Sequence, residues 1–211
     1  MSQVRDLFDE WARAGRAADM ERGHAPAARL AFDRLRLRHD AHYLDIGCGN
    51  GYTVRWAAAA APRGTAVGVD ASAEMIGLAR KMSVGLSNVE LVAGEFPTVE
   101  LPAGPYDAIL SMEVFYYLPD LDDSMRAVHG LLRPGGLFAC VVDYYGENEA
   151  SHSWPAEMGV PMTLLDSAGW ADALRRAGLA VVAQRRLRVP RDQATSTWKT
   201  TQGSLMTLGR R

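Results

Sequence analysis

The sequence has few cysteines and no long run of one charge. Cys48 and Cys140 are the only two cysteines among 211 residues, and neither has histidine or cysteine neighbours at the spacing of a zinc site. We therefore expect neither a disulfide framework nor a zinc centre. The formal net charge is −2, and basic residues form no long run. This disfavours a dedicated nucleic-acid binder, because such proteins carry a basic patch.

The sequence also lacks a long apolar tract and a recognisable leader. No apolar run approaches the roughly 20 residues that a membrane-spanning helix needs, and residues 1–6 do not resemble a signal sequence. These absences favour a cytoplasmic protein without a membrane partner. Hydrophobic residues make up 48% of the sequence. That is enough for a sizeable core in the single domain that a chain of about 200 residues usually forms.

The stretch Leu44–Gly51 (LDIGCGNG) organises the rest of the sequence. Residues 42–46 before it predict a short buried strand, and the alanine-rich segment 52–61 after it predicts a helix, because alanine is the best helix former. Glycines at alternate positions can adopt positive φ and let a ligand lie against bare backbone. The N–H groups at the start of the helix point at the same place. This layout is typical of the first βα unit of a nucleotide-binding fold.

A second and a third βα unit follow the first. Residues 65–69 predict a strand, and Asp70 stands at its end, where an acidic residue in such folds accepts hydrogen bonds from ribose hydroxyls. Ser72 is a good N-cap for a helix that we expect to end near Gly85. Residues 88–92 predict the next strand. The glycine-rich turn and the acid at the next strand end together favour a bound nucleoside.

On these residues the sequence resembles the class I S-adenosylmethionine-dependent methyltransferases. Asp45–Gly51 matches their Asp-x-Gly-x-Gly-x-Gly motif, and Asp70 matches their ribose-binding acid. The dehydrogenase pattern Gly-x-Gly-x-x-Gly places its third glycine one residue later. Residues 131–138 (LLRPGGLF) are also typical of the family, and their proline and paired glycines turn a helix into a strand. The resemblance covers five units in order, from about residue 42 to residue 142.

The resemblance implies an α/β fold with a doubly wound, seven-stranded, mostly parallel sheet in the order 3-2-1-4-5-7-6, the last strand antiparallel. We expect one methyltransferase domain over residues 1–211. Within it, 1–38 form a helical cap or lid, 42–142 the cofactor-binding core, and 143–211 a substrate-side loop followed by a C-terminal helix and strands.

The individual elements expected outside the first three units follow from hydrophobic periodicity and turn residues. In the cap, Gly15 and Gly23 interrupt the pattern, so we expect a second helix over 27–37. The further strands and helices are expected at 106–111, 120–132, 137–142, 167–177, 179–189 and 204–208, with a turn at 133–136 and a long loop at 143–162.

The family implies S-adenosylmethionine as cofactor and S-adenosylhomocysteine as its product. Glu95 stands where the family usually has an aspartate bonded to the adenine amino group. It is one methylene longer, so a solvated loop acid is the alternative for this residue. The residues expected to bind the cofactor are Asp45, Gly47, Cys48, Gly49, Asn50, Gly51, Asp70, Ala71, Met75, Gly94, Glu95, Phe96, Ser111 and Met112.

The segment after the fourth strand departs from the family pattern. Tyr116 and Tyr117 stand where small-molecule methyltransferases often have a Glu-His pair, and the Asn/Asp-Pro-Pro-Tyr/Phe motif of base-amino or protein-amide methylation is absent. We therefore expect a small-molecule acceptor, with Tyr116 as the best candidate for a catalytic contact. Glu113 and Asp120 alone do not make an acidic metal cluster, so no metal is expected.

Several other aromatic and histidine residues are candidates for contact with the acceptor, and for each of them packing in the core or at the rim is an equal alternative. The candidates are Trp11, His24, Tyr116, Tyr117, Tyr144, Tyr145, His152 and Trp154.

Methyl transfer from a sulfonium is an in-line displacement that mainly requires a nucleophile held about 3 Å from the methyl carbon. A base is needed only when the nucleophile carries a proton of high pKa. Because this fold serves oxygen, nitrogen, carbon and sulfur nucleophiles, the motifs predict the methyl donor but not the acceptor. Two alternatives keep the fold and change the activity: a nicotinamide-dependent oxidoreductase and a non-catalytic S-adenosylmethionine-binding protein.

Overall fold

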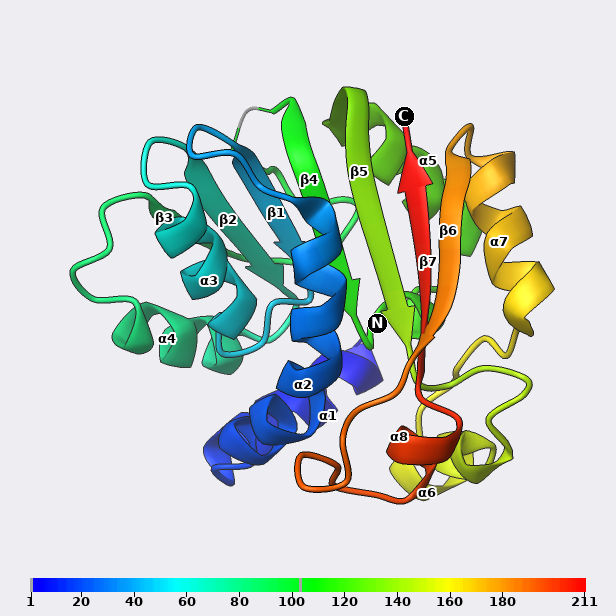
Figure 1. The fold of residues 1–211 in the computed structure, drawn as a ribbon. Coiled ribbons are helices and arrows are strands. Elements are labelled where there is room, and N and C mark those ends of the chain that lie inside the picture. The colour runs from blue at the N-terminus through cyan, green and yellow to red at the C-terminus, as the bar shows by residue number, and fades with distance from the viewer. Residues whose placement is uncertain (1, 103) are drawn as a thin grey trace.

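The computed structural model describes residues 2–102 and 104–211. Its seven strands form one sheet in the order β3-β2-β1-β4-β5-β7-β6 (Figure 1). The parallel pairings involve β1 to β5, and β7 runs antiparallel to both β5 and β6. The predicted fold and strand order are therefore confirmed. The strands are β1 (His42–Ile46), β2 (Thr65–Asp70), β3 (Val89–Ala93), β4 (Tyr106–Met112), β5 (Leu132–Val142), β6 (Ala180–Leu187) and β7 (Ser204–Arg210).

Helices cover both faces of the sheet. They are α1 (Ser2–Arg13), α2 (Ala17–Leu35), α3 (Tyr52–Ala60), α4 (Ala73–Met82), α5 (Leu121–Leu131), α6 (Trp154–Met158), α7 (Ser167–Arg176) and α8 (Trp198–Thr201), with 3-10 turns η1 (Phe115–Tyr117) and η2 (Glu149–Ser151). Side chains alternate between the two faces of a strand. Accordingly Tyr43 packs in a core with α2 and α3, whereas Leu44 and Ile46 pack in a core with α5 and α7.

The cap differs from its prediction at the start of the second helix. Gly15, with φ of 75°, separates the first two helices, but α2 begins at Ala17 rather than near Ala27. Gly23 lies inside this helix, because an isolated glycine in a helical pattern is tolerated at a modest cost. The prediction that Gly23 breaks the pattern was wrong, and α2 is longer than expected. Its first turns bring Met20, Glu21 and His24 to the carboxyl ends of the strands.

The fifth strand also begins earlier than expected. β5 starts at Leu132, which pairs with Tyr106, and the next pair is Ala108 with Leu137. The predicted turn at 133–136 is therefore an irregularity inside β5, with Gly135 at φ of 79°. In the long loop after β5, η2 and α6 form where no regular structure was expected. The cap expected at Ser72 is present, and its hydroxyl accepts the backbone N–H of Met75. Asp120 caps α5 in the same way and accepts the N–H of Asp123.

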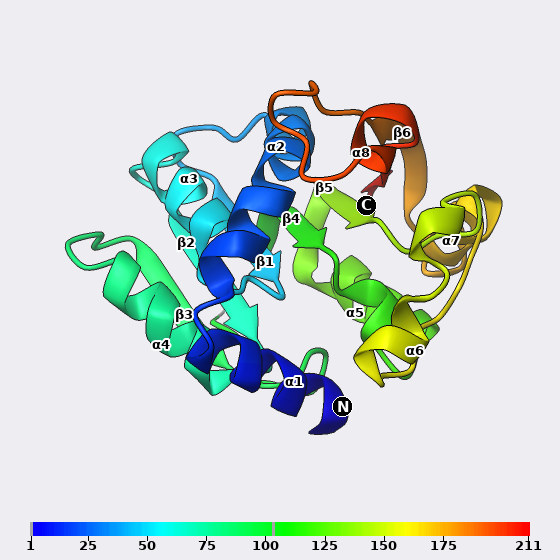
Figure 2. The same ribbon diagram turned by 90° about the horizontal axis from the view of Figure 1, so that it is seen from below.

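The carboxyl ends of the parallel strands meet at one edge of the sheet. Figures 1 and 2 show α1, α2, α6 and α8 gathered at this edge, so segments from both ends of the sequence surround the place where ligands bind in such sheets. Across residues 2–102 and 104–211, none of the helices combines the length and the apolar character that crossing a bilayer requires.

Candidate functional site

A cavity of about 510 Å³ lies at the carboxyl ends of the strands. Its wall combines residues of α1 and α2, the glycine-rich loop after β1, the segment after β2, the segment after β4, and α6. A volume of this size is typical of pockets for small molecules and cofactors. Nine of the expected cofactor residues line it: Asp45, Gly47, Cys48, Gly49, Asn50, Asp70, Ala71, Met75 and Met112.

The glycine-rich loop folds back onto the end of β2. Gly47 and Cys48 both donate their N–H groups to the carbonyl of Val69, at 2.8 and 3.0 Å. Gly47, Gly49 and Gly51 have φ of 75°, 53° and 78°, a region that glycine adopts without steric cost. A Cβ on Gly47 would lie 2.1 Å from a methyl group of Val114, whereas a Cβ on Gly49 would meet nothing within 4 Å. Gly49 therefore offers bare backbone to the cavity.

Two carboxyl groups beside this loop face the cavity. Asp70 accepts hydrogen bonds from the backbone N–H groups of Gly49 and Ser72, both at 2.8 Å. Asp45 accepts a hydrogen bond from the hydroxyl of Thr53. Burial raises the pKa of Asp70 to about 6 and the pKa of Asp45 to about 7, because burial disfavours the charged form. These carboxylates can accept further hydrogen bonds from ligand hydroxyl or ammonium groups.

The other expected cofactor residues do not line the cavity. The carboxylate of Glu95 lies 3.8 Å from the guanidinium of Arg5, and the ring of Phe96 packs 6.2 Å from that of Phe115. Ser111 donates its hydroxyl to the carbonyl of Ile46. Gly51 caps α3, and Gly94 packs against Val99. Their contact with a cofactor stays a prediction.

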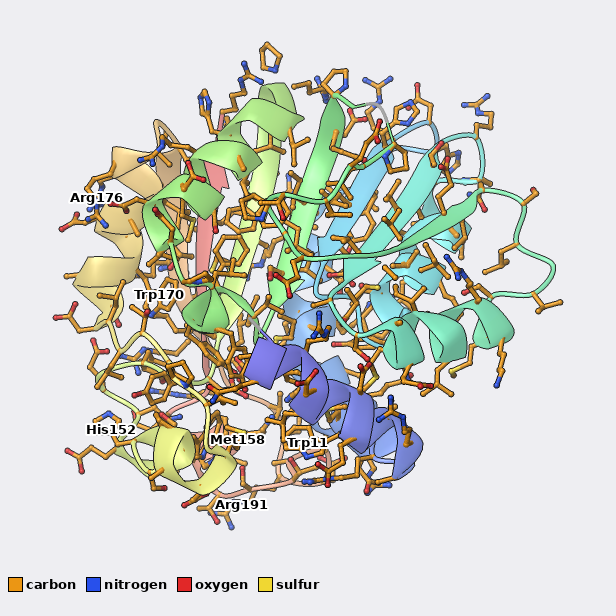
Figure 3. All side chains as sticks on the ribbon, turned by 180° about the vertical axis from the view of Figure 1, so that it is seen from behind. Trp11, His152, Met158, Trp170, Arg176 and Arg191 are labelled. Carbon is orange, nitrogen blue, oxygen red and sulfur yellow. The ribbon has the colours of Figure 1, made fainter. Side chains whose placement is uncertain are left out.

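Aromatic and thioether side chains form much of the rest of the cavity wall. Of the predicted acceptor contacts, Trp11, His24, Tyr116, Tyr117 and Trp154 line it. Phe8, Met20 and Met158 line it as well. The rings of Phe8 and Tyr117 are 5.7 Å apart. Trp11 of α1 and Met158 of α6 lie at the same end of the molecule (Figure 3).

Three predicted acceptor contacts lie away from the cavity. Tyr145 is fully buried, donates its hydroxyl to the carbonyl of Gly203 and accepts a hydrogen bond from Arg186. Tyr144 packs behind Tyr116, with ring centroids 5.6 Å apart. His152 is exposed at the outer margin of the molecule (Figure 3). These positions fit the packing alternative rather than contact with an acceptor.

A polar cluster that was not expected from the sequence borders the cavity beside Tyr116. His24, Glu113 and Asp143 each bring one nitrogen or oxygen atom within 4.8 Å of the others, and Lys199 lies 3.3 Å from Asp143. Glu113 and Asp143 directly follow β4 and β5. The carboxyl ends of parallel strands are where ligands bind, so this signal was available in the sequence. His24 and Lys199 reach the cluster only through the fold.

The backbone and side chain of Glu113 are held in an unusual geometry. Its φ is 64°, a conformation that non-glycine residues adopt at a cost and that clusters at functional sites. The backbone N–H of Asp143 donates to one oxygen of Glu113, and the hydroxyl of Tyr116 donates to the other at 2.7 Å. Burial and the neighbouring Asp143 raise the pKa of Glu113 well above its usual value. Tyr116 thus acts here as a donor to Glu113.

Comparison with known proteins places most of the chain in one family. A family model described as "Methyltransferase domain" matches residues 16–184. Among curated relatives, trans-aconitate 2-methyltransferase of Azoarcus sp. (strain BH72) is 35% identical over 113 residues, 54% of this chain and 43% of the relative. Demethylmenaquinone methyltransferase of Staphylococcus aureus is 26% identical over 108 residues, 51% of this chain and 45% of the relative. The matches thus span less than half of the length of these relatives.

Solved structures give the same result over nearly the whole chain. A chain from the complex of the Haloferax volcanii Trm112 methyltransferase activator with a protein described as a methyltransferase superposes with a TM-score of 0.88 and 30% identity, covering 96% of each chain. The 1,6-didemethyltoxoflavin-N1-methyltransferase of Burkholderia thailandensis, solved with S-adenosylhomocysteine, has a TM-score of 0.72 and 21% identity. It covers 100% of this chain and 88% of that chain, and at this identity it shows a shared fold.

Proposed function

The chain belongs to the class I S-adenosylmethionine-dependent methyltransferases, and from this premise we propose that it transfers the methyl group of S-adenosylmethionine to a small-molecule acceptor. One observation carries the proposal. One cavity is lined both by Asp45, Asp70 and the glycine-rich loop and by aromatic side chains such as Tyr116, Tyr117 and Trp154. Donor and acceptor can therefore lie against each other in one cavity, which is the main requirement of an in-line displacement. The division of one domain into residues 1–38, 42–142 and 143–211 is part of this proposal.

The residues at the cofactor end fit S-adenosylmethionine, which supplies an activated methyl group on a sulfonium. Asp70 would accept hydrogen bonds from the ribose hydroxyls, as acids at this place do in such folds. Gly49 leaves room for the ligand against the backbone. Asp45 adds a second buried carboxylate that favours a cationic ligand.

The wall at the acceptor end supports a small acceptor. Tyr116, Tyr117 and Trp154 bury apolar surface, and their rings also suit a cation such as a sulfonium. Two of the relatives described above are named for small acceptors, trans-aconitate and 1,6-didemethyltoxoflavin. Their names support a small acceptor for this chain as well.

Calorimetric titration with S-adenosylhomocysteine tests the proposal. We expect micromolar binding to the wild type and at least tenfold weaker binding to Asp70→Ala, because lost hydrogen bonds to a carboxylate are worth about 2 kcal/mol. Asp192→Ala removes an exposed carboxylate outside the cavity and is expected to bind like the wild type.

Other results would favour the two alternatives. Failure of the wild type to bind S-adenosylhomocysteine, together with binding of NADH, would favour the oxidoreductase. Tight binding of S-adenosylhomocysteine without methyl transfer to any compound of a broad metabolite panel would favour a non-catalytic binding protein.

A protein partner is a second proposal, because the Haloferax relative was solved in complex with a methyltransferase activator. Strand β3 lies at the end of the sheet order. The end of α4 and the segment that joins it to β3 expose Met82, Val84 and Leu86, and Val84 is 84% exposed. An apolar cluster of this kind often marks a protein interface. We propose that an activator protein like that of the Haloferax complex docks there.

Co-expression with the Haloferax volcanii Trm112 protein and gel filtration test this docking. We expect co-elution with the wild type and its loss in Val84→Asp. Val182 is an exposed valine of β6, at the other end of the sheet order, so Val182→Asp is the matched control. Equal loss of co-elution in both variants, or none in either, would contradict docking at the α4–β3 segment.

A further inference from the structure

The polar cluster has two layers: two of its residues line the cavity, and two are buried behind them. His24 and Glu113 line the cavity. Asp143 and Lys199 are buried behind them, at 1% and 6% exposure. Lys199 donates a hydrogen bond to the carbonyl of Gly23 at 2.6 Å and lies 3.3 Å from an oxygen of Asp143. The acceptor in the cavity can therefore reach His24 and Glu113, whereas the other two hold the arrangement from behind.

The charges of the cluster leave Glu113 without a cation of its own. The ammonium of Lys199 balances the carboxylate of Asp143, which accepts no hydrogen bond from the described residues. Burial and the charge of Lys199 lower the pKa of His24 to about 4, so its ring is neutral near pH 7 and can accept a hydrogen bond. Glu113 accepts hydrogen bonds from Tyr116 and from the backbone N–H of Asp143. Among the described residues no Lys or Arg side chain forms an ion pair with it, although the charge of Lys199 acts on it from beside Asp143. A positively charged ligand in the cavity would supply the counterion that Glu113 lacks.

The wall of the whole cavity likewise carries more acidic than basic side chains. Among residues 2–102 and 104–211, the charged residues that line it are the acids Glu21, Asp45, Asp70, Glu113 and Glu157 and the single arginine Arg16. The guanidinium of Arg16 already lies 4.2 Å above the ring of Trp11. Acidic groups at low dielectric and aromatic faces both favour positively charged ligands. An anionic acceptor would be repelled.

We propose that the methyl acceptor is a small amine with an aromatic or apolar body, and that Glu113 accepts its proton while His24 accepts a second hydrogen bond from the same nitrogen. This inference rests on the function proposed above and specifies the acceptor class and the proton acceptor for it. Tyr116 and Asp143 are positioning residues, because each donates a hydrogen bond to Glu113.

The proposed step balances in atoms and charge. An ammonium that enters the cavity gives one proton to the Glu113 carboxylate and becomes a neutral amine. The nitrogen lone pair then attacks the methyl carbon of S-adenosylmethionine, so the N–C bond forms and the C–S bond breaks. The electron pair of that bond stays on sulfur, which yields neutral S-adenosylhomocysteine and a methylated ammonium. Glu113 returns its proton to solvent after the products leave. The raised pKa of Glu113 makes it a stronger base than an ordinary carboxylate.

His24, Glu113 and Asp143 could also be considered as ligands of a metal ion, since their donor atoms converge. The ammonium of Lys199 beside Asp143 supplies the countercharge that a metal would bring, and it would repel a divalent cation. We therefore assign the cluster to proton transfer.

Binding of two matched probes to the enzyme saturated with S-adenosylhomocysteine tests the proposal. Tyramine carries an ammonium on a phenyl body, and 3-(4-hydroxyphenyl)propionate carries a carboxylate on the same body. We expect tyramine to bind at least tenfold more tightly to the wild type. Glu113→Gln should bind tyramine at least tenfold more weakly and keep its affinity for S-adenosylhomocysteine. Glu10→Gln, an exposed site on α1, should leave both affinities unchanged.

The pH dependence separates proton acceptance from a purely structural role. Because the carboxylate form of Glu113 is required, tyramine binding should weaken as pH falls through the pKa of Glu113. Removing the hydroxyl that lowers this pKa, in Tyr116→Phe, should move the weakening to higher pH, and Glu113→Gln should abolish it. The groups that face Glu113 and contribute to this profile are His24 of α2, Tyr52 of α3, Tyr116 and Tyr117 of η1, Cys140 of β5, Asp143 after β5 and Lys199 of α8.

The proposal is overturned if the carboxylate probe binds as well as tyramine, if tyramine does not bind to the wild type, or if Glu113→Gln keeps both the affinity for tyramine and its pH profile. Thermal melting of Glu113→Gln and Tyr116→Phe identifies a variant that fails to fold. Since Tyr116→Phe keeps the carboxylate, it continues the test if Glu113→Gln is unfolded. Failure of the wild type to bind S-adenosylhomocysteine would instead overturn the proposed function.

Discussion

At the cofactor end of the cavity, Gly47, Gly49 and Asp70 come from two successive βα units, and each was identifiable from its neighbours in the sequence. At the acceptor end, His24, Glu113 and Trp154 come from α2, the end of β4 and α6. The first end depends on local turns of the backbone. The second depends on which distant segments the sheet brings together.

The register of the sheet explains how the acceptor end is assembled. Met112 of β4 pairs with Val141 of β5, and the N–H of Glu113 donates to the carbonyl of Val141 at 2.9 Å. This parallel pairing places Glu113 beside Asp143. Lys199 then binds the carbonyl of Gly23 across 176 positions of sequence. Local motifs thus describe a binding loop well, whereas the residues around an acceptor are fixed by long-range packing.

The largest expected effect concerns the buried ion pair between Lys199 and Asp143. Lys199→Met keeps the aliphatic stem but removes the ammonium, so the buried carboxylate of Asp143 loses its counterion. Breaking a buried pair in this way costs about 3 kcal/mol or more, and urea unfolding should show it. The double variant Asp143→Asn/Lys199→Met removes both charges and should recover most of the loss. A single variant as stable as the wild type would show that the acceptor end does not depend on this pair.

The glycine-rich loop should respond through local geometry instead. Gly47→Ala forces an alanine to a φ of 75° and directs its Cβ to within 2.1 Å of Val114, so we expect a loss of about 2 kcal/mol in the free energy of unfolding. Gly49→Ala has open space around its Cβ and should lose about 1 kcal/mol.

The order of the two glycine variants should be reversed for cofactor binding, with Gly49→Ala affected more than Gly47→Ala. The open space beside Gly49 belongs to the cavity, so Gly49→Ala should weaken S-adenosylhomocysteine binding more strongly than its small effect on stability suggests. Calorimetry and urea unfolding of both variants separate the two effects. If the two variants lost the same unfolding free energy and the same affinity for S-adenosylhomocysteine, Gly47 and Gly49 would not have separate roles in folding and binding.

The pH dependence of cofactor binding should be moderate. Asp70 and Asp45 have pKa values raised to about 6 and about 7, so both are largely protonated at pH 5 and ionised at pH 8. Ionised carboxylates accept stronger hydrogen bonds, and S-adenosylhomocysteine should therefore bind several-fold more tightly at pH 8. Asp70→Asn should retain only the part of this dependence that comes from Asp45. A flat profile in the wild type would contradict a role of these carboxylates in binding.

The smallest effect is expected from an aromatic side chain of the acceptor wall. Trp154 is partly exposed and packs near Trp198, with ring centroids 6.1 Å apart. Trp154→Ala should lower the free energy of unfolding by only about 1 kcal/mol, because the ring packs against the margin of the core and is partly exposed. It should weaken tyramine binding and leave S-adenosylhomocysteine binding unchanged, as measured by calorimetry. A loss of S-adenosylhomocysteine affinity would show that the two ends of the cavity are not separate.

The sheet order followed from the resemblance to the methyltransferase family, which the motifs of residues 42–142 carry. The residues of the glycine-rich loop and Asp70 were predictable because a strand, a glycine turn and an acid at the next strand end follow one another closely in the sequence. The sequence was insufficient where one residue type suits two structures. Gly23 was read as a break and lies inside α2, since the packing of that helix against the sheet outweighs the low helix propensity of glycine. Tyr145 was an acceptor candidate by its place after β5, but its hydroxyl is used by Gly203 and Arg186.

Helix α2 touches both ends of the cavity. Glu21 accepts a hydrogen bond from Asn50 of the glycine-rich loop at 2.7 Å, and His24, one turn further along the same helix, stands in the acceptor cluster. Residues three positions apart share one face of a helix, so α2 cannot withdraw from one end without withdrawing from the other. In kinetic terms, we expect both products to leave through one opening of the site, and substitutions that loosen α2 to shorten the residence times of both.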